Sequence, residues 1–172
     1  MKQKNGFTLI ELLVVVSVIA VLSGLMLTVI DPRGLRAKTR DSQRIADLKK
    51  IQSALELYFA DFRAYPASGS WGTWVKVTGA DYMSTALSPN YLSKVPVDPT
   101  NDAGNANPCS GPTTYRYNYR SSSTGGAYIL AAIMEVSTSN DGFECNLLNS
   151  WSTLGCGAVY ATSGVCYGVE NP

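Results

Sequence analysis

The residue types that could support catalysis are few, because the chain contains no histidine. This absence removes the commonest general base, the usual zinc ligand and every Ser-His or Cys-His nucleophile pair. No phosphate-binding loop and no carboxylate pair in a recognisable catalytic context takes their place. We therefore predict that the protein is not an enzyme. Three features remain to be explained, namely Glu11 within an apolar run, four cysteines, and an Asp- and Asn-rich loop that follows Asp98.

Glu11 is the only formal charge in residues 7–30. As a helix this stretch would be about 36 Å long, which suffices for a hydrocarbon layer of about 30 Å and predicts a transmembrane helix. A carboxylate at this depth costs on the order of a few kcal/mol unless it is paired or snorkels to the headgroups. Residues 1–6 carry Lys2 and Lys4 but are too short for an ordinary secretory signal.

The residues around Glu11 carry a family resemblance. The segment Gly6-Phe7-Thr8-Leu9-Ile10-Glu11-Leu12-Leu13 resembles the processing motif of type IV pilins and of the pseudopilins of type II secretion. The resemblance continues more loosely through Tyr65-Pro66. Residues 91–99, Tyr-Leu-Ser-Lys-Val-Pro-Val-Asp-Pro, are similar to the major pseudopilin of type II secretion, although pilins of several bacterial groups share this stretch.

The resemblance implies a processing and assembly route. A prepilin peptidase would cut after Gly6 on the cytoplasmic side, and Phe7 would become an N-methylated terminus. The mature chain would then lose Lys2 and Lys4, which changes 14 basic and 13 acidic residues to 12 and 13, a net charge of −1. Glu11 of an incoming subunit would pair with the Phe7 amine of its neighbour, so that assembly relieves two buried charges together.

The rest of the apolar segment also predicts helix association. Ala20, Gly24 and Thr28 recur every fourth residue and so lie near one helix face, where small side chains allow close packing in lipid. Many pilins have a proline near the position of Thr28, whereas here it is Pro32. We expect a kink or local unwinding between Thr28 and Pro32, or a new helix that Asp31 caps and Pro32 begins.

A second, amphipathic helix is predicted over residues 31–63. Its apolar side chains step by three and four: Ile45, Leu48, Ile51, Leu55, Tyr58, Phe59 and Phe62. The opposite, solvent-facing side is predicted to hold Arg40, Arg44, Asp47, Lys50 and Asp61. Tyr65-Pro66 should end this helix. The basic residues that follow the apolar segment would place the head in the cytoplasm by the positive-inside rule, against the topology that the resemblance implies.

The remaining residues, 64–172, are predicted to form a globular head with a small antiparallel sheet, so the fold class is α+β. Residues 114–120 and 127–136 should form a hairpin around a turn at residues 121–126. Short strands are expected at residues 159–161 and 165–169, and a short helix at residues 82–87. Trp71 and Trp74 are expected to pack in the core or against another subunit.

All four cysteines lie in this head, at Cys109, Cys145, Cys156 and Cys166. No pair has C-x-x-C spacing and there is no histidine, so zinc or redox chemistry is the weaker interpretation. The stronger interpretation is that the four cysteines form two disulfides in an oxidising compartment. Of the three connectivities we favour Cys156 with Cys166, across residues 157–165, which leaves Cys109 with Cys145.

The loop after Asp98-Pro99 is a candidate calcium site, with Asp98 and Asp102 as ligands. Hard cations prefer oxygen ligands, and some related pseudopilins bind calcium near such an Asp-Pro step. Here Thr100 follows where those relatives tend to have an aromatic residue. The alternative is a loop in which Asn, Asp, Gly and Pro serve backbone turns alone. No other cofactor is predicted.

The function predicted from these features is that of a structural subunit of a type IV pilus or pseudopilus. It would lie in the inner or cytoplasmic membrane as a single-pass protein with a cytoplasmic leader, residues 1–6, and an extracytoplasmic head. Its partners would be further copies of itself, minor pilins or pseudopilins, the prepilin peptidase, the assembly platform and lipid. The net charge of +1 predicts no nucleic acid. The alternative is a monomeric, membrane-tethered domain with a ligand at Trp71 and Trp74 or at the Asp98 loop.

Overall fold

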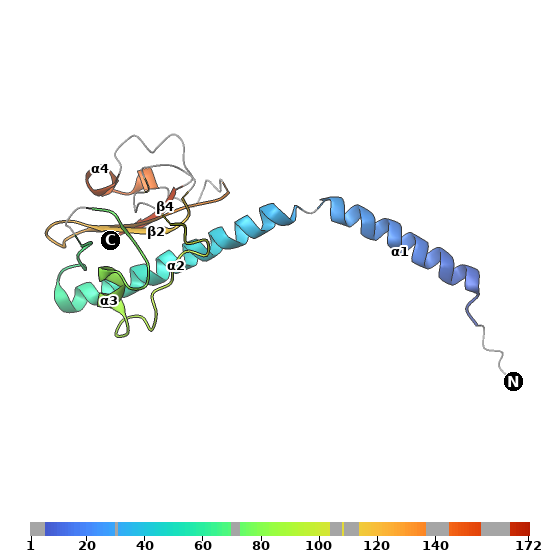
Figure 1. Ribbon diagram of the computed structural model, residues 1–172, viewed down its shortest axis with the longest axis horizontal. Coiled ribbons are helices and arrows are strands. Elements are labelled where there is room, and N and C mark those ends of the chain that lie inside the picture. Colours follow the sequence, from blue (N-terminus) through green and yellow to red (C-terminus); the bar gives the residue numbers. More distant parts are fainter. Residues whose placement is uncertain are drawn as a thin grey trace. The chain divides into compact units, whose positions relative to one another are not determined.

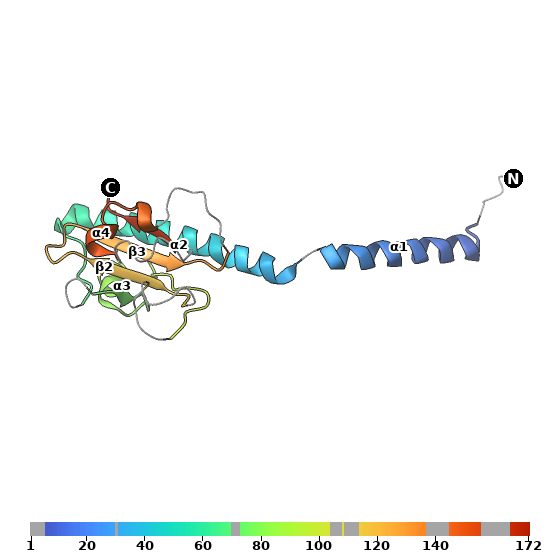
Figure 2. The same cartoon turned by 90° about the horizontal axis from the view of Figure 1, so that it is seen from above.

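The computed structural model describes residues 6–29, 31–69, 73–103, 108, 114–136, 145–155 and 166–172. It divides into two units, Met1–Arg36 and Ala37–Pro172. The first unit holds helix α1 (Leu9–Val29) and the start of helix α2 (Pro32–Phe62). The second unit holds the rest of α2, which packs on a small antiparallel sheet (Figures 1 and 2). The α+β class predicted from the sequence is confirmed.

Helix α2 has clear start and stop signals. Asp31 Oδ1 accepts a hydrogen bond from the Arg33 N–H (3.0 Å), and Pro32, which has no N–H to satisfy, is the first helical residue. The helix ends at Phe62, after which Arg63 adopts a left-handed φ of 55°. α1 and α2 are thus separate helices, and the predicted kink at Pro32 stays a prediction.

The sheet has the order β1-β2-β3-β4, and every neighbouring pair of strands is antiparallel. The strands are β1 (Val75–Lys76), β2 (Tyr117–Ser121), β3 (Tyr128–Ile133) and β4 (Cys166–Glu170). β2 and β3 form the predicted hairpin, and β4 corresponds to the strand predicted at residues 165–169. The strand predicted at residues 159–161 lies outside the described residues.

The β2–β3 turn depends on Gly125, which has a φ of +68°. Its carbonyl accepts a hydrogen bond from the Tyr65 N–H (2.8 Å), and a Cβ at this position would lie 3.0 Å from Cβ of Ala64. A glycine is therefore required both for the backbone conformation and for the close approach of the chain that leaves α2.

The main core lies between α2 and one face of the sheet. Leu48, Ile51 and Leu55 of α2 are fully buried in it. The short helix α3 (Tyr82–Leu87), predicted from the sequence, adds Met83 and Leu87 at one side. The sheet contributes a row of aromatic and aliphatic side chains, namely Tyr117, Tyr119, Tyr128, Leu130, Ala132, Tyr167 and Val169.

A second core covers the opposite face of the sheet. The 3₁₀ helix η2 (Cys145–Leu147) and helix α4 (Trp151–Leu154) lie on this face, on the side opposite α2 (Figure 1). Trp151 packs 6.1 Å from the half-buried Trp74, centroid to centroid. The expected packing role of Trp74 is confirmed, while Trp71 lies outside the described residues. Because the sheet is buried on both faces, every residue of β3 is buried.

One sequence-based assignment for α2 is wrong. Arg44 and Asp47 were predicted on the solvent side, but the Arg44 side chain is fully buried and Asp47 accepts a hydrogen bond from the Tyr117 hydroxyl (2.9 Å). Both face the head because their hydrogen-bonding groups find partners there, which removes most of the cost of burial. The apolar pattern alone could not reveal those partners.

Candidate functional site

The N-terminal end of α1 is closed by Thr8 and Glu11. Thr8 Oγ1 accepts a hydrogen bond from the Glu11 N–H (3.3 Å), and Glu11 Oε2 accepts from the N–H (2.9 Å) and the O–H (2.7 Å) of Thr8. This reciprocal arrangement is a capping box, which satisfies N–H groups that have no partner in the first helical turn. The carboxylate is therefore held at the N-terminal end of α1, which begins at Leu9.

The residues before Thr8 are open to solvent. Phe7 is 86% exposed, and a Cβ placed on Gly6 would meet no heavy atom within 4 Å. The peptide bond between these two residues is thus not shielded by the described residues around it. It is the bond at which the sequence predicts processing.

The described part of the α1 surface, residues 9–24, is largely apolar and uncovered. Every described side chain from residue 9 to residue 24 is exposed, and Ser17 satisfies its hydroxyl on its own helix by donating to the Leu13 carbonyl (2.7 Å). A Cβ on Gly24 would meet nothing within 4 Å, so contacts with the described residues do not require a glycine there. Ala20 and Gly24 lie on this exposed surface; the Thr28 side chain is outside the described residues.

Within the part of the chain that the structure describes, no helix was found that combines the length and the apolar character needed to cross a membrane. The membrane span expected at residues 7–30 stays a prediction.

In the head, the buried Arg44 connects α2 to two loops. Its Nε and Nη2 donate to the carboxylate of Asp98 (2.7 and 3.1 Å), and its Nη1 donates to Asp41 (2.7 Å) and Glu135 (2.8 Å). Nη2 also donates to the Thr100 hydroxyl (3.0 Å). Bidentate and charge-assisted hydrogen bonds of this kind are the strong ones, so Arg44 fixes the Asp98 loop and the end of β3 on α2.

Asp41 and Arg40 complete this cluster from the same helix. Asp41, itself buried, accepts backbone N–H groups of Glu135 (3.0 Å) and Val136 (2.8 Å), while Arg40 forms an ion pair with Glu135. Hydrogen bonding to Arg40 is the main reason that the pKa of Glu135 is lowered to about 2, and Arg44 adds to it.

The two calcium candidates lie in the same loop but face different partners. Asp98 is bound by Arg44, and its Oδ1 also accepts the Thr100 N–H (2.8 Å). Asp102 Oδ2 accepts the N–H of Tyr115 (2.8 Å). Among the described residues, no group of three or more Cys, Asp or Glu side chains is placed to hold a metal ion. Calcium binding by the loop stays a prediction.

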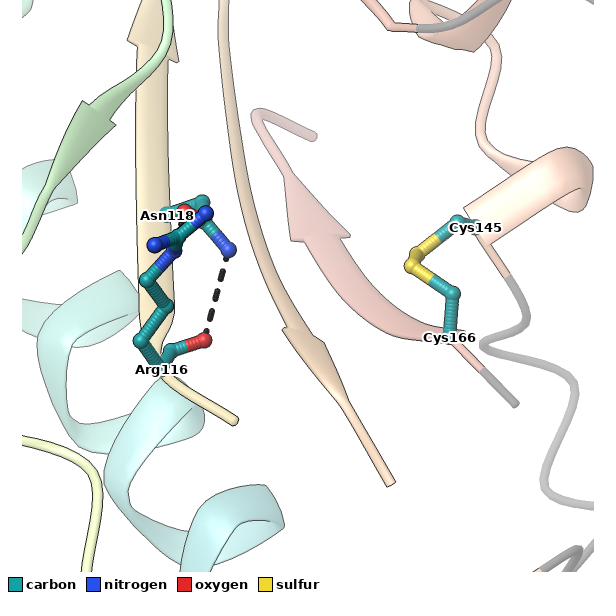
Figure 3. Close-up of a disulfide and its surroundings, with 4 residues drawn as sticks. All are labelled: Arg116, Asn118, Cys145 and Cys166. Carbon is teal, nitrogen blue, oxygen red and sulfur yellow. Dashed lines mark hydrogen bonds between the residues drawn. A yellow bond between two sulfur atoms is a disulfide. The ribbon is translucent and has the colours of Figure 1, made fainter. Parts of the chain in front are cut away.

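The described disulfide joins Cys145 of η2 to Cys166 at the start of β4, with a Cα–Cα distance of 5.4 Å (Figure 3). The favoured pairings of Cys156 with Cys166 and of Cys109 with Cys145 are therefore wrong. That choice rested on the short separation of Cys156 and Cys166 in the sequence. The entropic cost of closing a loop rises only slowly with its length, so the packing of the folded chain determines which cysteines pair. Here η2 lies on the sheet beside β4, and Cys109 and Cys156 lie outside the described residues.

Comparison with known proteins now identifies the family. Residues 1–27 match the model of a family described as a prokaryotic N-terminal methylation motif. The chain is 36% identical over 100 residues to the type II secretion system core protein G of Pseudomonas aeruginosa. The aligned region covers 57% of this chain and 69% of the relative. The chain belongs to the family of type II secretion system core protein G.

Further core protein G relatives agree with this membership. The chain is 26% identical over 100 residues to the protein of Aeromonas hydrophila, with 57% of this chain and 68% of the relative covered. It is 29% identical over 100 residues to the Escherichia coli K12 protein, with 56% and 67% covered. No solved structure was found to match the chain. The resemblance predicted from the sequence is thus confirmed.

Two residues of this core protein G family member were missed in the sequence analysis. Thr8 was quoted only as part of the processing motif, although Thr8-Leu9-Ile10-Glu11 has the S/T-x-x-E pattern of a capping box. Arg44 was assigned to a solvated face. The signal that could have found it is weak, because an Asp three residues before an Arg is common on exposed helices as well.

Proposed function

We propose that this member of the core protein G family is a structural subunit of a type II secretion pseudopilus and polymerises through α1. The observation that carries the proposal is the segment from Gly6 to Glu11, which lies within the matched methylation motif and contains the start of the exposed apolar helix α1. A structural role without catalysis fits a chain that lacks histidine.

Processing would begin at the exposed Gly6-Phe7 bond. A prepilin peptidase cuts there and methylates the new amine of Phe7, which leaves a positive charge close to the first turn of α1. In the free subunit, Glu11 is satisfied by Thr8 of its own chain. During assembly, the carboxylate of the incoming subunit pairs with the Phe7 amine of its neighbour, and the two charges neutralise each other in a medium where each alone is costly.

The exposed surface of α1 supplies the second part of assembly. In lipid, or in the interior of a filament, helices associate through close van der Waals contact, to which small residues contribute by allowing backbones to approach. Ala20 and Gly24 are exposed, and no contact among the described residues explains the glycine. We infer that this face, with Thr28, packs against the helices of neighbouring subunits.

The disulfide supports an extracytoplasmic head. Cys145 and Cys166 are joined across the second core, and such bonds persist in oxidising compartments. The mature subunit would thus be anchored in the inner membrane by α1, with its head in the periplasm. Its partners would be further copies, other pseudopilins, the prepilin peptidase, the assembly platform and membrane lipid.

Mass spectrometry of the intact, membrane-extracted chain, before and after reduction, tests the proposal. We expect loss of residues 1–6, a methyl group on Phe7, and a mass increase on reduction. An unprocessed N-terminus together with reduced cysteines contradicts the proposal and favours a tethered monomer that faces the cytoplasm. If the chain is processed but is absent from sheared or cross-linked filaments, the processing part of the proposal stands and the polymerisation part is contradicted.

A further inference from the structure

The head contains a cage of oxygen atoms built around Arg44. Five oxygens accept hydrogen bonds from its guanidinium: both carboxylate oxygens of Asp98, one each from Asp41 and Glu135, and the Thr100 hydroxyl. The Arg44 and Asp98 side chains are fully buried, and Cζ of Arg44 lies 5.0 Å from the centroid of the Tyr115 ring. Three carboxylates and a hydroxyl from a helix, a loop and a strand end thus converge on one positive group.

The same kinds of ligand would suit a hard divalent cation. Calcium takes roughly six to eight oxygen ligands, mostly carboxylates, carbonyls and waters. In this cage, however, both oxygens of Asp98 already bind Arg44, and Oδ1 also accepts backbone N–H groups of Thr100 (2.8 Å) and Asn101 (3.3 Å). A metal ion could use Asp98 only by displacing the guanidinium, whose positive charge would repel it at close range.

Lys76 is a second positively charged side chain that binds this loop. Lys76 Nζ on β1 donates to the backbone carbonyls of Asn101 (3.2 Å) and Asp102 (2.7 Å). The Asp102 carboxylate accepts the Tyr115 N–H rather than turning towards Asp98. The carboxylates of Asp98 and Asp102 and the backbone carbonyls of Asn101 and Asp102 are therefore engaged by the protein's own donors.

We propose that Arg44 is the resident cation of this cage and that Asp98 consequently binds no divalent metal ion. The inference is independent of the pseudopilus assignment, since it concerns only how the head is held together. Burial lowers the pKa of Arg44, but hydrogen bonds to Asp98, Glu135 and Asp41 outweigh this effect and raise the pKa overall. The guanidinium therefore keeps its charge at every pH at which the head is folded.

Thermal unfolding of the full-length chain in detergent tests the proposal, with EDTA in one sample and calcium in the other. About 5 mM calcium exceeds the dissociation constants of ~10⁻⁴–10⁻³ M typical of extracellular calcium modules. We expect the same melting midpoint in both samples. A rise in calcium that the variant Asp98→Asn loses would overturn the proposal. A rise of equal size in Asp98→Asn would place the ion elsewhere and leave the proposal standing.

The variant Arg44→Ser provides the converse test, because it leaves Asp41, Asp98 and Glu135 around an empty space. We expect a lower melting midpoint in EDTA and a partial recovery in calcium, together with terbium luminescence excited through Tyr115. Arg40→Ser is the matched control, because it removes one positive charge from the cluster but leaves Arg44 in the cage; it should show neither recovery nor terbium emission. If Arg44→Ser folds, but calcium does not raise its melting midpoint and terbium gives no luminescence, the proposal is overturned. If this variant does not fold, the comparison of wild type with Asp98→Asn decides alone.

Discussion

Glu11 Oε2 accepts hydrogen bonds from both the N–H (2.9 Å) and the O–H (2.7 Å) of Thr8, so the acidic side chain at the start of α1 is held by its own helix. A free subunit thus keeps the carboxylate partly compensated without a neighbour. Under the proposed function, assembly has to offer Glu11 a better partner than Thr8, and the charged amine at Phe7 of an adjacent subunit would be one.

The variant Glu11→Ala should leave the head folded but reduce filament yield on the order of tenfold or more, since ~1.4 kcal/mol per contact is a factor of ten. Thr8→Val should not lower filament yield in this way, because it removes the partner that Glu11 has in the free subunit but keeps the carboxylate. Filament recovery after shearing, normalised to processed subunit, measures both. Ser17→Ala is the control, because that hydroxyl binds only its own helix backbone in the structure. Normal filaments from Glu11→Ala would remove the charge contact from the mechanism.

Acid should destabilise the head through Glu135. Hydrogen bonding to Arg40 and Arg44 lowers the pKa of Glu135 to about 2, below its ordinary value of 4.5. The folded state thus binds this proton more weakly than the unfolded state. The stabilisation is complete above about pH 4.5 and is lost as the pH falls towards 2.

Urea unfolding at a series of pH values checks this expectation. In the variant Glu135→Gln the free energy of unfolding should be lower at pH 7 and should decline less steeply between pH 4.5 and pH 2. The variant Asp61→Asn is a useful control, because that carboxylate accepts a hydrogen bond from Tyr91 on the exposed side of α2. Equal acid sensitivity of Glu135→Gln and wild type would show that the ion pairs contribute nothing to the pH dependence.

Much of the fold follows from local patterns in the sequence. The three- and four-residue spacing of Leu48, Ile51 and Leu55 is enough to predict the buried face of α2. The turn-rich stretch between two β-branched and aromatic runs likewise predicts the hairpin that Tyr119 and Leu130 form as directly opposed residues. These features depend on neighbours a few residues apart, and the sequence displays those directly.

The parts that the sequence did not predict depend on partners distant along the chain. Arg44 is buried because Asp98 and Glu135 meet it from two loops, and Cys145 pairs with Cys166 because η2 lies on β4. Neither relationship leaves a periodic signal. The capping box at Thr8 is different, because its S/T-x-x-E pattern spans only four residues and could have been predicted from the sequence.

The Cys145–Cys166 bond should be recovered by peptide mapping without reduction. If a second disulfide exists, it must join Cys109 to Cys156, since these are the two remaining cysteines. The double variant Cys145→Ser, Cys166→Ser should lose about 2–4 kcal/mol of unfolding free energy, because the bond constrains the unfolded chain between residues 21 positions apart. A linked peptide that joins Cys156 to Cys166 would contradict the structure.

Gly168 tests the packing between β4 and the η2 segment that this disulfide fastens. A Cβ at Gly168 would lie 2.8 Å from Leu148 Cδ1 and 3.3 Å from Cys145 Sγ, so Gly168→Ala requires the Leu148 side chain to move and crowds the disulfide. Such overpacking costs about 1–3 kcal/mol. Gly126→Ala is the matched control, because its Cβ would meet only Thr124 Oγ1 at 3.4 Å, and a change within about 0.5 kcal/mol is expected. Denaturant unfolding compares the two variants. A Gly168→Ala protein as stable as Gly126→Ala would mean that the Leu148 side chain is not closely packed over Gly168 as described.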